Sequence, residues 1–169
     1  GWATSGKGRI FAAVETNSIK EPIVAETEKL IAKGFAKTSQ KDLLKHLAHP
    51  NMKVRLEAQF TLAERGEKNI TALAKLAADK SAKPVARRHA IWALGQIGRK
   101  NSRALTPLLP LLADTDAEIR AQSAKILGDD HLTEAFPGLV KLLEDSSLRV
   151  RYFATQSLGK LQRSDAVQP

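Results

Sequence analysis

The chain has no cysteine among its 169 residues. This sequence therefore forms no disulfide bond, no thiolate zinc site and no thioether-linked haem, and no cysteine serves as a nucleophile. Aromatic residues are scarce at 5%, whereas alanine and leucine are abundant. A core of small and aliphatic side chains favours closely packed helices over a β-sandwich.

Long apolar runs are missing as well. No stretch approaches the roughly eighteen consecutive apolar residues of a membrane-spanning helix, and the opening GWATSGKGRIF has no apolar signal-peptide region. We expect no membrane insertion by this segment, and we expect any export signal to lie outside it. Because 43% of the residues are hydrophobic, the chain is expected to fold as a domain.

The positive charge is unevenly placed along the chain. The net charge is +9, but residues 75–103 hold eight basic residues against Asp79 alone, and residues 114–145 hold eight acidic residues against three basic ones. A nucleic-acid-binding module that uses the 75–103 basic patch is the alternative function we keep open. The acidic stretch argues against it, because binding of duplex DNA needs an extended basic track.

Four segments of the chain align with one another. They read VRLEAQFTLAERG, ARRHAIWALGQIG, IRAQSAKILGDD and VRYFATQSLGKL. Each has an arginine at its second position, and these four are Arg55, Arg87, Arg120 and Arg151. Relative to the arginine, a small residue follows at +3, leucine at +7, and alanine or glycine at +8. Positions −1, +3 and +7 share one face of a helix, so each segment is predicted to be an amphipathic helix.

A leucine-rich segment precedes each of these helices, and turn-forming residues join the two. The four segments are residues 42–48, 70–78, 105–113 and 136–144. Each unit is then a helical hairpin that buries its apolar face only by stacking on its neighbours. In the third unit, Pro110 is expected to kink or delay the first helix.

The pattern V-R-x-x-A-x-x-x-L-G in the second helices resembles the short, lyase-like variant of the HEAT repeat. The resemblance covers residues 39–161. It implies an all-α fold, an α-α superhelix of the HEAT/armadillo type with about four hairpins, in which second helices line the concave face. Such arrays mostly bind other macromolecules.

The domain organisation follows from these segments. We expect residues 39–163 to be the HEAT-repeat domain and residues 164–169 to be a tail. Residues 21–38, opened by a proline and closed near a glycine, are predicted to form an N-terminal capping helix. Residues 1–20 are expected to be irregular, with a short strand at 8–14 that ends a preceding propeller domain.

A closer resemblance lies in the succession GKGRIF, ETEKLIAKGF, LAHPNMKVRLEAQFTLAERG and RRHAIWALGQIGR. It is similar to the middle region of large exported membrane-bound dehydrogenase-type proteins of planctomycetes and verrucomicrobia. In that family a β-propeller precedes the HEAT region and a c-type cytochrome domain with a CxxCH motif follows. The resemblance implies a scaffold within a larger oxidoreductase and a periplasmic or otherwise extracytoplasmic location. It transfers no catalytic residue, because the motifs of both chemical sites are missing here.

The four repeat arginines are interpreted as structural. Their stems can run along the edge of the core while their heads reach acids or carbonyls of a neighbouring turn, for which Asn51, Asp114 and Asp145 are available. The alternative is a ladder of anion ligands. Recurrence in every repeat favours the structural role.

Positions +1, +2 and +5 of the second helices are predicted to point away from the buried face. From these and the following turn we predict a partner-binding surface on the concave face. It consists of Phe60, Arg88, His89, Trp92, Gln96, Lys125, Tyr152 and Gln156. The alternative is that Phe60 and Trp92 pack against the next hairpin or a neighbouring domain.

The sequence has no pattern that indicates catalysis. It has no Gly-rich phosphate loop, no nucleophile elbow and no zinc-binding helix motif, and His46 and His49 lack a third ligand at a suitable spacing. We predict a non-catalytic module without cofactor or metal that binds protein, either neighbouring domains of the same chain or a separate protein. A tetrapyrrole- or small-molecule-handling module is a third hypothesis, based on the lyase-like motif alone.

Overall fold

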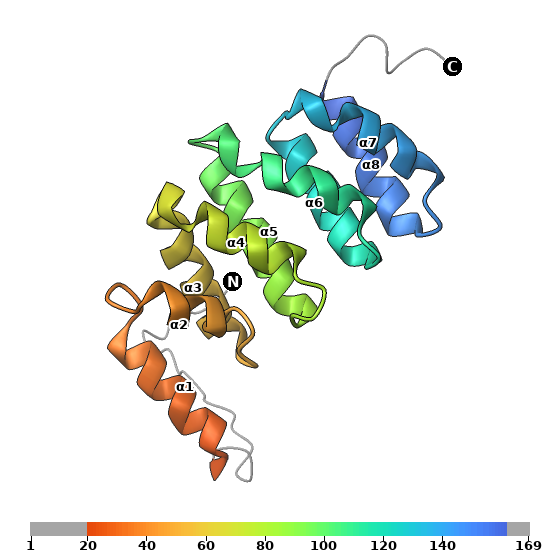
Figure 1. The fold of residues 1–169 in the computed structure, drawn as a ribbon. Helices are drawn as coiled ribbons and strands as arrows, with labels where there is room; N and C mark the ends of the chain where they lie inside the picture. The colour runs from red at the N-terminus through yellow and green to blue at the C-terminus, as the bar shows by residue number, and fades with distance from the viewer. Residues whose placement is uncertain (1–19, 162–169) are drawn as a thin grey trace, which may run out of the picture. The chain divides into compact units, whose positions relative to one another are not determined.

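The computed structural model describes residues 20–161 (Figure 1). The chain divides into two compact units, residues 1–33 and residues 34–169, which are described separately. All regular elements within residues 20–161 are helices, which confirms the predicted all-α fold. None of these helices is long and apolar enough to cross a membrane.

The first unit contains helix α1 (Pro22–Lys33). Proline is well suited to the first turn, because its missing N–H has no partner there. The helix ends before Gly34, whose φ of +72° is a left-handed conformation that glycine adopts without strain. The helix is thus shorter than the predicted 21–38, and its capping role stays a prediction. The predicted strand at 8–14 and the tail at 164–169 lie outside the described residues.

The second unit is an array of four hairpins, as predicted. In chain order the pairs are α2 (Gln40–His46) with α3 (Met52–Glu64), α4 (Ile70–Ala78) with α5 (Pro84–Gly98), the 3₁₀ helix η4 (Thr106–Ala113) with α6 (Ala117–Asp129), and α7 (Phe136–Lys141) with α8 (Leu148–Lys160). The 3₁₀ helix η6 (Leu142–Glu144) extends α7. The hairpins are joined through η2 (Gly66–Asn69), η3 (Ser102–Ala104) and η5 (Thr133–Ala135).

The first helix of the third hairpin is a 3₁₀ helix along its whole length. An α-helix here would need a hydrogen bond from residue 110 to the carbonyl of Thr106, but Pro110 has no N–H and its ring would clash with that carbonyl. The predicted kink is therefore a change of helix type. Leu108 and Leu112 of η4 are still buried.

The second helices form one continuous layer. Helices α3, α5, α6 and α8 pack side by side in chain order, whereas the first helices contact one another much less (Figure 1). In a curved stack the concave layer has the closer spacing, so this asymmetry agrees with second helices on the concave face. All twelve residues at positions −1, +3 and +7 are at most 9% exposed, as the repeat pattern predicts.

Position +8 sets how closely the second helices approach. A Cβ atom on Gly128 would lie 2.3 Å from Cβ and 2.5 Å from Cα of Ser157 in α8. The Ser157 hydroxyl donates to the Ala124 carbonyl over 2.8 Å at the same crossing. Gly159 is at the same position of the last hairpin, and among the described residues no atom lies within 4 Å of such a Cβ.

Replacing Gly128 with alanine should force α6 and α8 apart, since the added methyl meets backbone. We expect the free energy of unfolding to fall by about 2 kcal/mol. Gly159→Ala is the matched control and should stabilise by up to about 1 kcal/mol through helix propensity. Urea unfolding followed by circular dichroism measures both, and equal effects would contradict a close crossing at Gly128.

Candidate partner-binding surface

Two of the repeat arginines, Arg87 and Arg120, form ion pairs with the next hairpin. Arg87 is 3% exposed, forms a 2.5 Å ion pair with Asp114 in the following turn, and donates from Nε to the Ala77 carbonyl over 2.8 Å. Arg120 repeats this contact one hairpin later, because its Nε and Nη2 donate to the two carboxylate oxygens of Asp145 at 2.7 and 2.8 Å. Successive hairpins are thus joined by charged, forked hydrogen bonds.

The first and last repeat arginines differ from these two. Nη1 of Arg55 and Nη1 of Arg151 each donate over 2.7 Å to a carbonyl of their own turn, at His49 and Asp145 respectively. Nε of Arg55 donates to Nε2 of His89 over 3.1 Å. Nε and Nη2 of Arg151 have no hydrogen-bond partner within the described part of the chain.

His89 is buried, which corrects the prediction that it lies on the partner-binding surface. Its side chain is 3% exposed and lies between Arg55 and Gln59 of α3, with Nδ1 2.7 Å from the Gln59 side-chain oxygen. Gln122, at the same +2 position of α6, is buried as well. The helical wheel fails here because each second helix has neighbours on both sides of the stack.

The hydrogen bonds fix the protonation of His89. The Arg55 guanidinium only donates, so Nε2 of His89 accepts and the proton is on Nδ1, which donates to Gln59. Burial, together with the positive charges of Arg55 and Arg88, lowers the pKa of His89 to about 4. At neutral pH this histidine is an uncharged structural link between α3 and α5.

A second polar connection crosses the later helices. Trp92 of α5 donates from Nε1 to the Gln122 side chain over 2.8 Å, and Gln122 donates to Glu118 over 2.8 Å. Arg149 of α8 donates to the other oxygen of Glu118 over 2.9 Å and lies 5.1 Å from the Phe153 ring centre. Trp92 therefore contacts the next hairpin.

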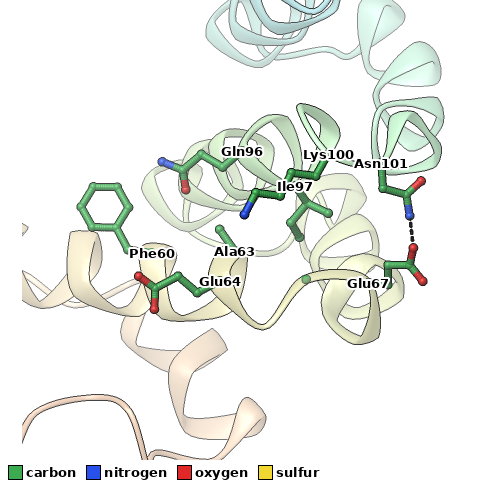
Figure 2. A pocket seen from close by; sticks show the side chains of 9 residues that line it. Phe60, Ala63, Glu64, Glu67, Gln96, Ile97, Lys100 and Asn101 are labelled. Atoms are coloured by element: carbon green, nitrogen blue, oxygen red, sulfur yellow. Dashed lines mark hydrogen bonds between the residues drawn. The ribbon is translucent and has the colours of Figure 1, made fainter.

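A groove of about 430 Å³ lies between the C-terminal halves of α3 and α5 (Figure 2). Phe60, 43% exposed, stands at one end, and Asn101 donates to Glu67 over 2.5 Å at the other. The lining residues are Phe60, Ala63, Glu64, Gly66, Glu67, Gln96, Ile97, Lys100 and Asn101. The groove thus has an apolar floor with charges of both signs around it.

One polar atom in the groove is unsatisfied. The side-chain oxygen Oε1 of Gln96 is buried and has no hydrogen-bond partner among the described residues. A buried acceptor without a donor costs about 1–3 kcal/mol. This oxygen has almost no accessible surface, so it accepts a donor from outside the chain only after the Gln96 side chain turns it toward the groove.

The structure brings only Phe60 and Gln96 of the predicted surface into this groove. The others lie elsewhere: Arg88, His89, Trp92, Lys125, Tyr152 and Gln156. Lys125 pairs with Asp129 on its own helix. Tyr152 is 57% exposed on α8, where its hydroxyl accepts a 2.9 Å hydrogen bond from Gln156. Six of the eight predicted residues therefore lie outside the groove.

The charged groove residues Glu64, Glu67 and Lys100 were missed by the sequence reasoning. Glu64 is at position +9 of its hairpin, and Gln96 is at the same position of the next one. A helical wheel that continues one turn beyond position +5 therefore identifies Glu64. Glu67 lies in η2 and Lys100 directly follows α5. No repeat column marks these two.

Basic residues of the stretch 75–103 lie at both ends of α5. Lys80 and Lys83 precede α5, whereas Arg99 and Lys100 follow it. The 15 residues of α5 separate the two groups by about 22 Å, and Arg87 between them is occupied by Asp114. The nucleic-acid hypothesis stays untested, but its basic residues are divided between two ends of a helix.

His46 and His49 have a structural role in the turn between α2 and α3. Nδ1 of His49 accepts the backbone N–H of Asn51 over 3.0 Å, within the turn between α2 and α3. The rings of His46 and His49 pack edge to face, 6.3 Å between centres. Over residues 20–161, no three side chains of metal-binding type converge.

Asp114→Asn removes the charge opposite the buried Arg87. We expect the free energy of unfolding to fall by about 3 kcal/mol at neutral pH, because the guanidinium is left without a counter-charge. Asp79→Asn is the matched control: Asp79 starts the equivalent turn but hydrogen-bonds to Ser81 within it, so little change is expected. Denaturant titrations test this, and equal losses would exclude a special role for the pair.

The contribution of Asp114 to the free energy of unfolding should also depend on pH. Burial by itself raises the pKa of Asp114, but hydrogen bonds from Arg87 and the Asp116 N–H outweigh it and lower the pKa below 3.8. The stabilisation is therefore complete above pH 3.8 and is lost as the pH falls through the folded-state value. The difference between wild type and Asp114→Asn should shrink in that acid range.

The lowered pKa of His89 predicts a second pH effect. The unfolded chain takes up a proton near pH 6.5 and the folded chain only near pH 4, so stability should fall by about 3 kcal/mol as the pH is lowered across this range. The free energy of unfolding of the His89→Gln variant should depend less on pH, because this variant lacks the histidine with the lowered pKa and keeps the other three. Urea titrations at intervals of pH measure both slopes; identical slopes would contradict a neutral buried His89.

A search of curated protein sequences finds no match, whereas 26 chains of solved structures match. One is a designed armadillo repeat protein in complex with peptide (KR)4, with 22% identity and a TM-score of 0.48 over 81% of this chain and 68% of that one. Another is the complex of CpcE and CpcF of phycocyanin lyase from a Nostoc species, with 19% identity and a TM-score of 0.41 over 75% of this chain and 66% of that one.

A comparison with protein-family models finds a match over most of the chain. The family model described as HEAT repeats matches residues 41–124 and 105–169. Apart from Gln40, the first residue of α2, these ranges contain all four hairpins, and they contain all four repeat arginines. The chain belongs to the HEAT-repeat family.

Proposed function

We propose that the array is a non-catalytic protein-interaction module that binds an extended segment of a partner protein in the groove between α3 and α5. The observation that carries this is the buried, unpartnered Gln96 oxygen in a groove that also exposes Phe60. An extended peptide backbone supplies free N–H donors, which is what this acceptor lacks. An exposed aromatic beside such an acceptor is typical of an interaction hot spot.

The groove also constrains the side chains of the bound segment. Its floor is formed by Ala63 and Ile97, so an apolar side chain of the peptide packs there and against the Phe60 ring. Glu64 and Lys100 stand at the rim (Figure 2). A segment with one apolar anchor and charges of both signs beside it fits these walls, and rim charges of this kind contribute more to specificity than to affinity.

We also propose that this module is part of a larger exported oxidoreductase and holds its neighbouring domains. The support is the order of sequence motifs that resembles planctomycete and verrucomicrobial dehydrogenase-type proteins, and an extracytoplasmic location belongs to the same proposal. Reading the parent coding sequence for propeller repeats upstream and a CxxCH motif downstream tests it. Their absence on both sides would contradict it.

Selection from a display library of random linear peptides tests the groove. We expect selected peptides to lose at least tenfold in affinity for Phe60→Ala, because a hot-spot aromatic is worth more than about 1.4 kcal/mol. Gln96→Leu should weaken binding similarly by removing the acceptor. Tyr152→Ala, which changes an exposed aromatic outside the groove, is the matched control and should leave the affinity unchanged.

Two outcomes would overturn the proposal. One is that selected peptides bind Phe60→Ala and Gln96→Leu as tightly as wild type. The other is that the protein selects no peptide but binds duplex DNA at low salt, with a steep salt dependence that disappears when Arg88, Lys100 and Arg103 are all alanine. That result would establish the nucleic-acid alternative.

A further inference from the structure

Two side chains of opposite charge in the groove have no partner among the described residues. Glu64 of α3 and Lys100, which follows α5, both line the groove and are exposed. Within residues 20–161, neither side chain forms an ion pair or a hydrogen bond. The third charged residue of the groove, Glu67, already accepts a 2.5 Å hydrogen bond from Asn101. The groove therefore offers an occupant one negative and one positive charge.

Helices α3 and α5 run in the same direction, with equivalent positions at about the same height. His89, at position +2 of α5, hydrogen-bonds to Arg55 at position 0 and to Gln59 at position +4 of α3. Near the other ends of the helices, Ala63 at +8 and Ile97 at +10 line the same groove. The groove thus runs along the two helices, and the position number of a residue measures how far along it the residue lies.

Three exposed residues of the groove stand one helical turn apart. Phe60 is at position +5, Glu64 at +9 and Lys100 at +13. Lys100 continues the last turn of α5, because its N–H donates to the Ile97 carbonyl over 3.0 Å. Each step of four residues is about 6 Å, and long side chains lean toward the N-terminus of their helix, so the offset persists at their tips. Figure 2 shows this order, with the Lys100 nitrogen farther toward Asn101 than the Glu64 carboxylate.

The spacing of these residues matches an extended polypeptide. Side chains two residues apart in an extended segment point to the same face and are separated by about 6.6 Å. Three such side chains therefore lie beside Phe60, Glu64 and Lys100 in turn. The first packs on an aromatic ring and is apolar, the second faces a carboxylate, and the third faces an ammonium group. Coulomb attraction favours a basic second residue and an acidic third residue, and it is stronger near the protein surface than in bulk water.

We propose that the groove selects a charge order in an extended segment of a partner protein: an apolar anchor, a basic residue two positions away and an acidic residue two positions farther. This selection rests on the proposed peptide binding and adds its charge specificity. Side-chain positions fix the order relative to the anchor in either chain direction, so Leu-x-Lys-x-Asp and Asp-x-Lys-x-Leu both satisfy it. The opposite order places like charges together and is disfavoured.

Two peptide display libraries test the charge order. One has the framework Leu-x-Lys-x-Asp and the other Leu-x-Asp-x-Lys, each with random residues at x and each made in both chain directions. We expect the wild-type protein to enrich the first roughly tenfold or more over the second, because the exchange replaces two attractions by two repulsions. A protein with both Glu64→Lys and Lys100→Glu should show the reverse preference.

A matched double variant outside the groove is the control. Lys75→Glu with Glu144→Lys exchanges two exposed charges that do not line the groove, and it should leave the preference unchanged. Circular dichroism confirms that each protein variant is folded.

The outcomes separate the charge order from the proposed function. Equal enrichment of the two libraries, with binding that still depends on Phe60 and Gln96, would overturn the charge order and leave the groove as the binding site. A preference that the Glu64→Lys and Lys100→Glu exchange does not reverse would overturn it as well, because the selection would then come from another surface. If the unrestricted library of random peptides also yields no binder, the proposed function fails too.

The test also distinguishes a partner protein from a second copy of this chain. Residues 161–165, LQRSD, have the proposed order. Self-association in sedimentation equilibrium that is abolished by the exchange of the Glu64 and Lys100 charges would overturn a partner protein as the occupant and identify a second copy instead. A monomeric protein that enriches the first library supports the partner segment.

Discussion

The contact between an arginine of one hairpin and the turn of the next determines how this array is built. A single hairpin cannot bury its apolar face, so its fold depends on a fixed position of its neighbour. Arg87 with Asp114, and Arg120 with Asp145, fix that position by directional hydrogen bonds at one end of the second helices. The Gly128 crossing and the Trp92 to Gln122 hydrogen bond follow from the same arrangement.

The junction between the first and second hairpins is built differently. Asp79 stands eight residues before Arg87, whereas Asp114 and Asp145 stand six before their arginines, so the longer turn keeps Asp79 at the surface. Arg55 binds the neutral His89 instead. Position +8 is Ala63 here, where the next two hairpins have Gly95 and Gly128. The groove lies at this junction, between α3 and α5.

The sequence predicted the scaffold better than the surface. Val54, Ala58 and Leu62, with their equivalents, follow a helical period that burial imposes on every hairpin, so the fold was predictable from spacing alone. His89 was misplaced because a helical wheel treats a helix as if it had one buried side, whereas a helix within a stack has two. Glu67 and Lys100 lie where the chain leaves the helices, and their proximity in the groove depends on the turn geometry. A repeat pattern contains no information about that geometry.

Because every hairpin contacts mainly the next one, the array behaves as a chain of nearest-neighbour couplings, and folding can propagate from one unit to another. The couplings are unequal. Two junctions have an ion pair and a glycine crossing, and the first has a neutral histidine and an alanine. Local opening in such a chain begins at its weakest coupling. The first hairpin should therefore exchange its amide hydrogens before the other three, and its separation from α5 would open the groove without unfolding the rest of the array.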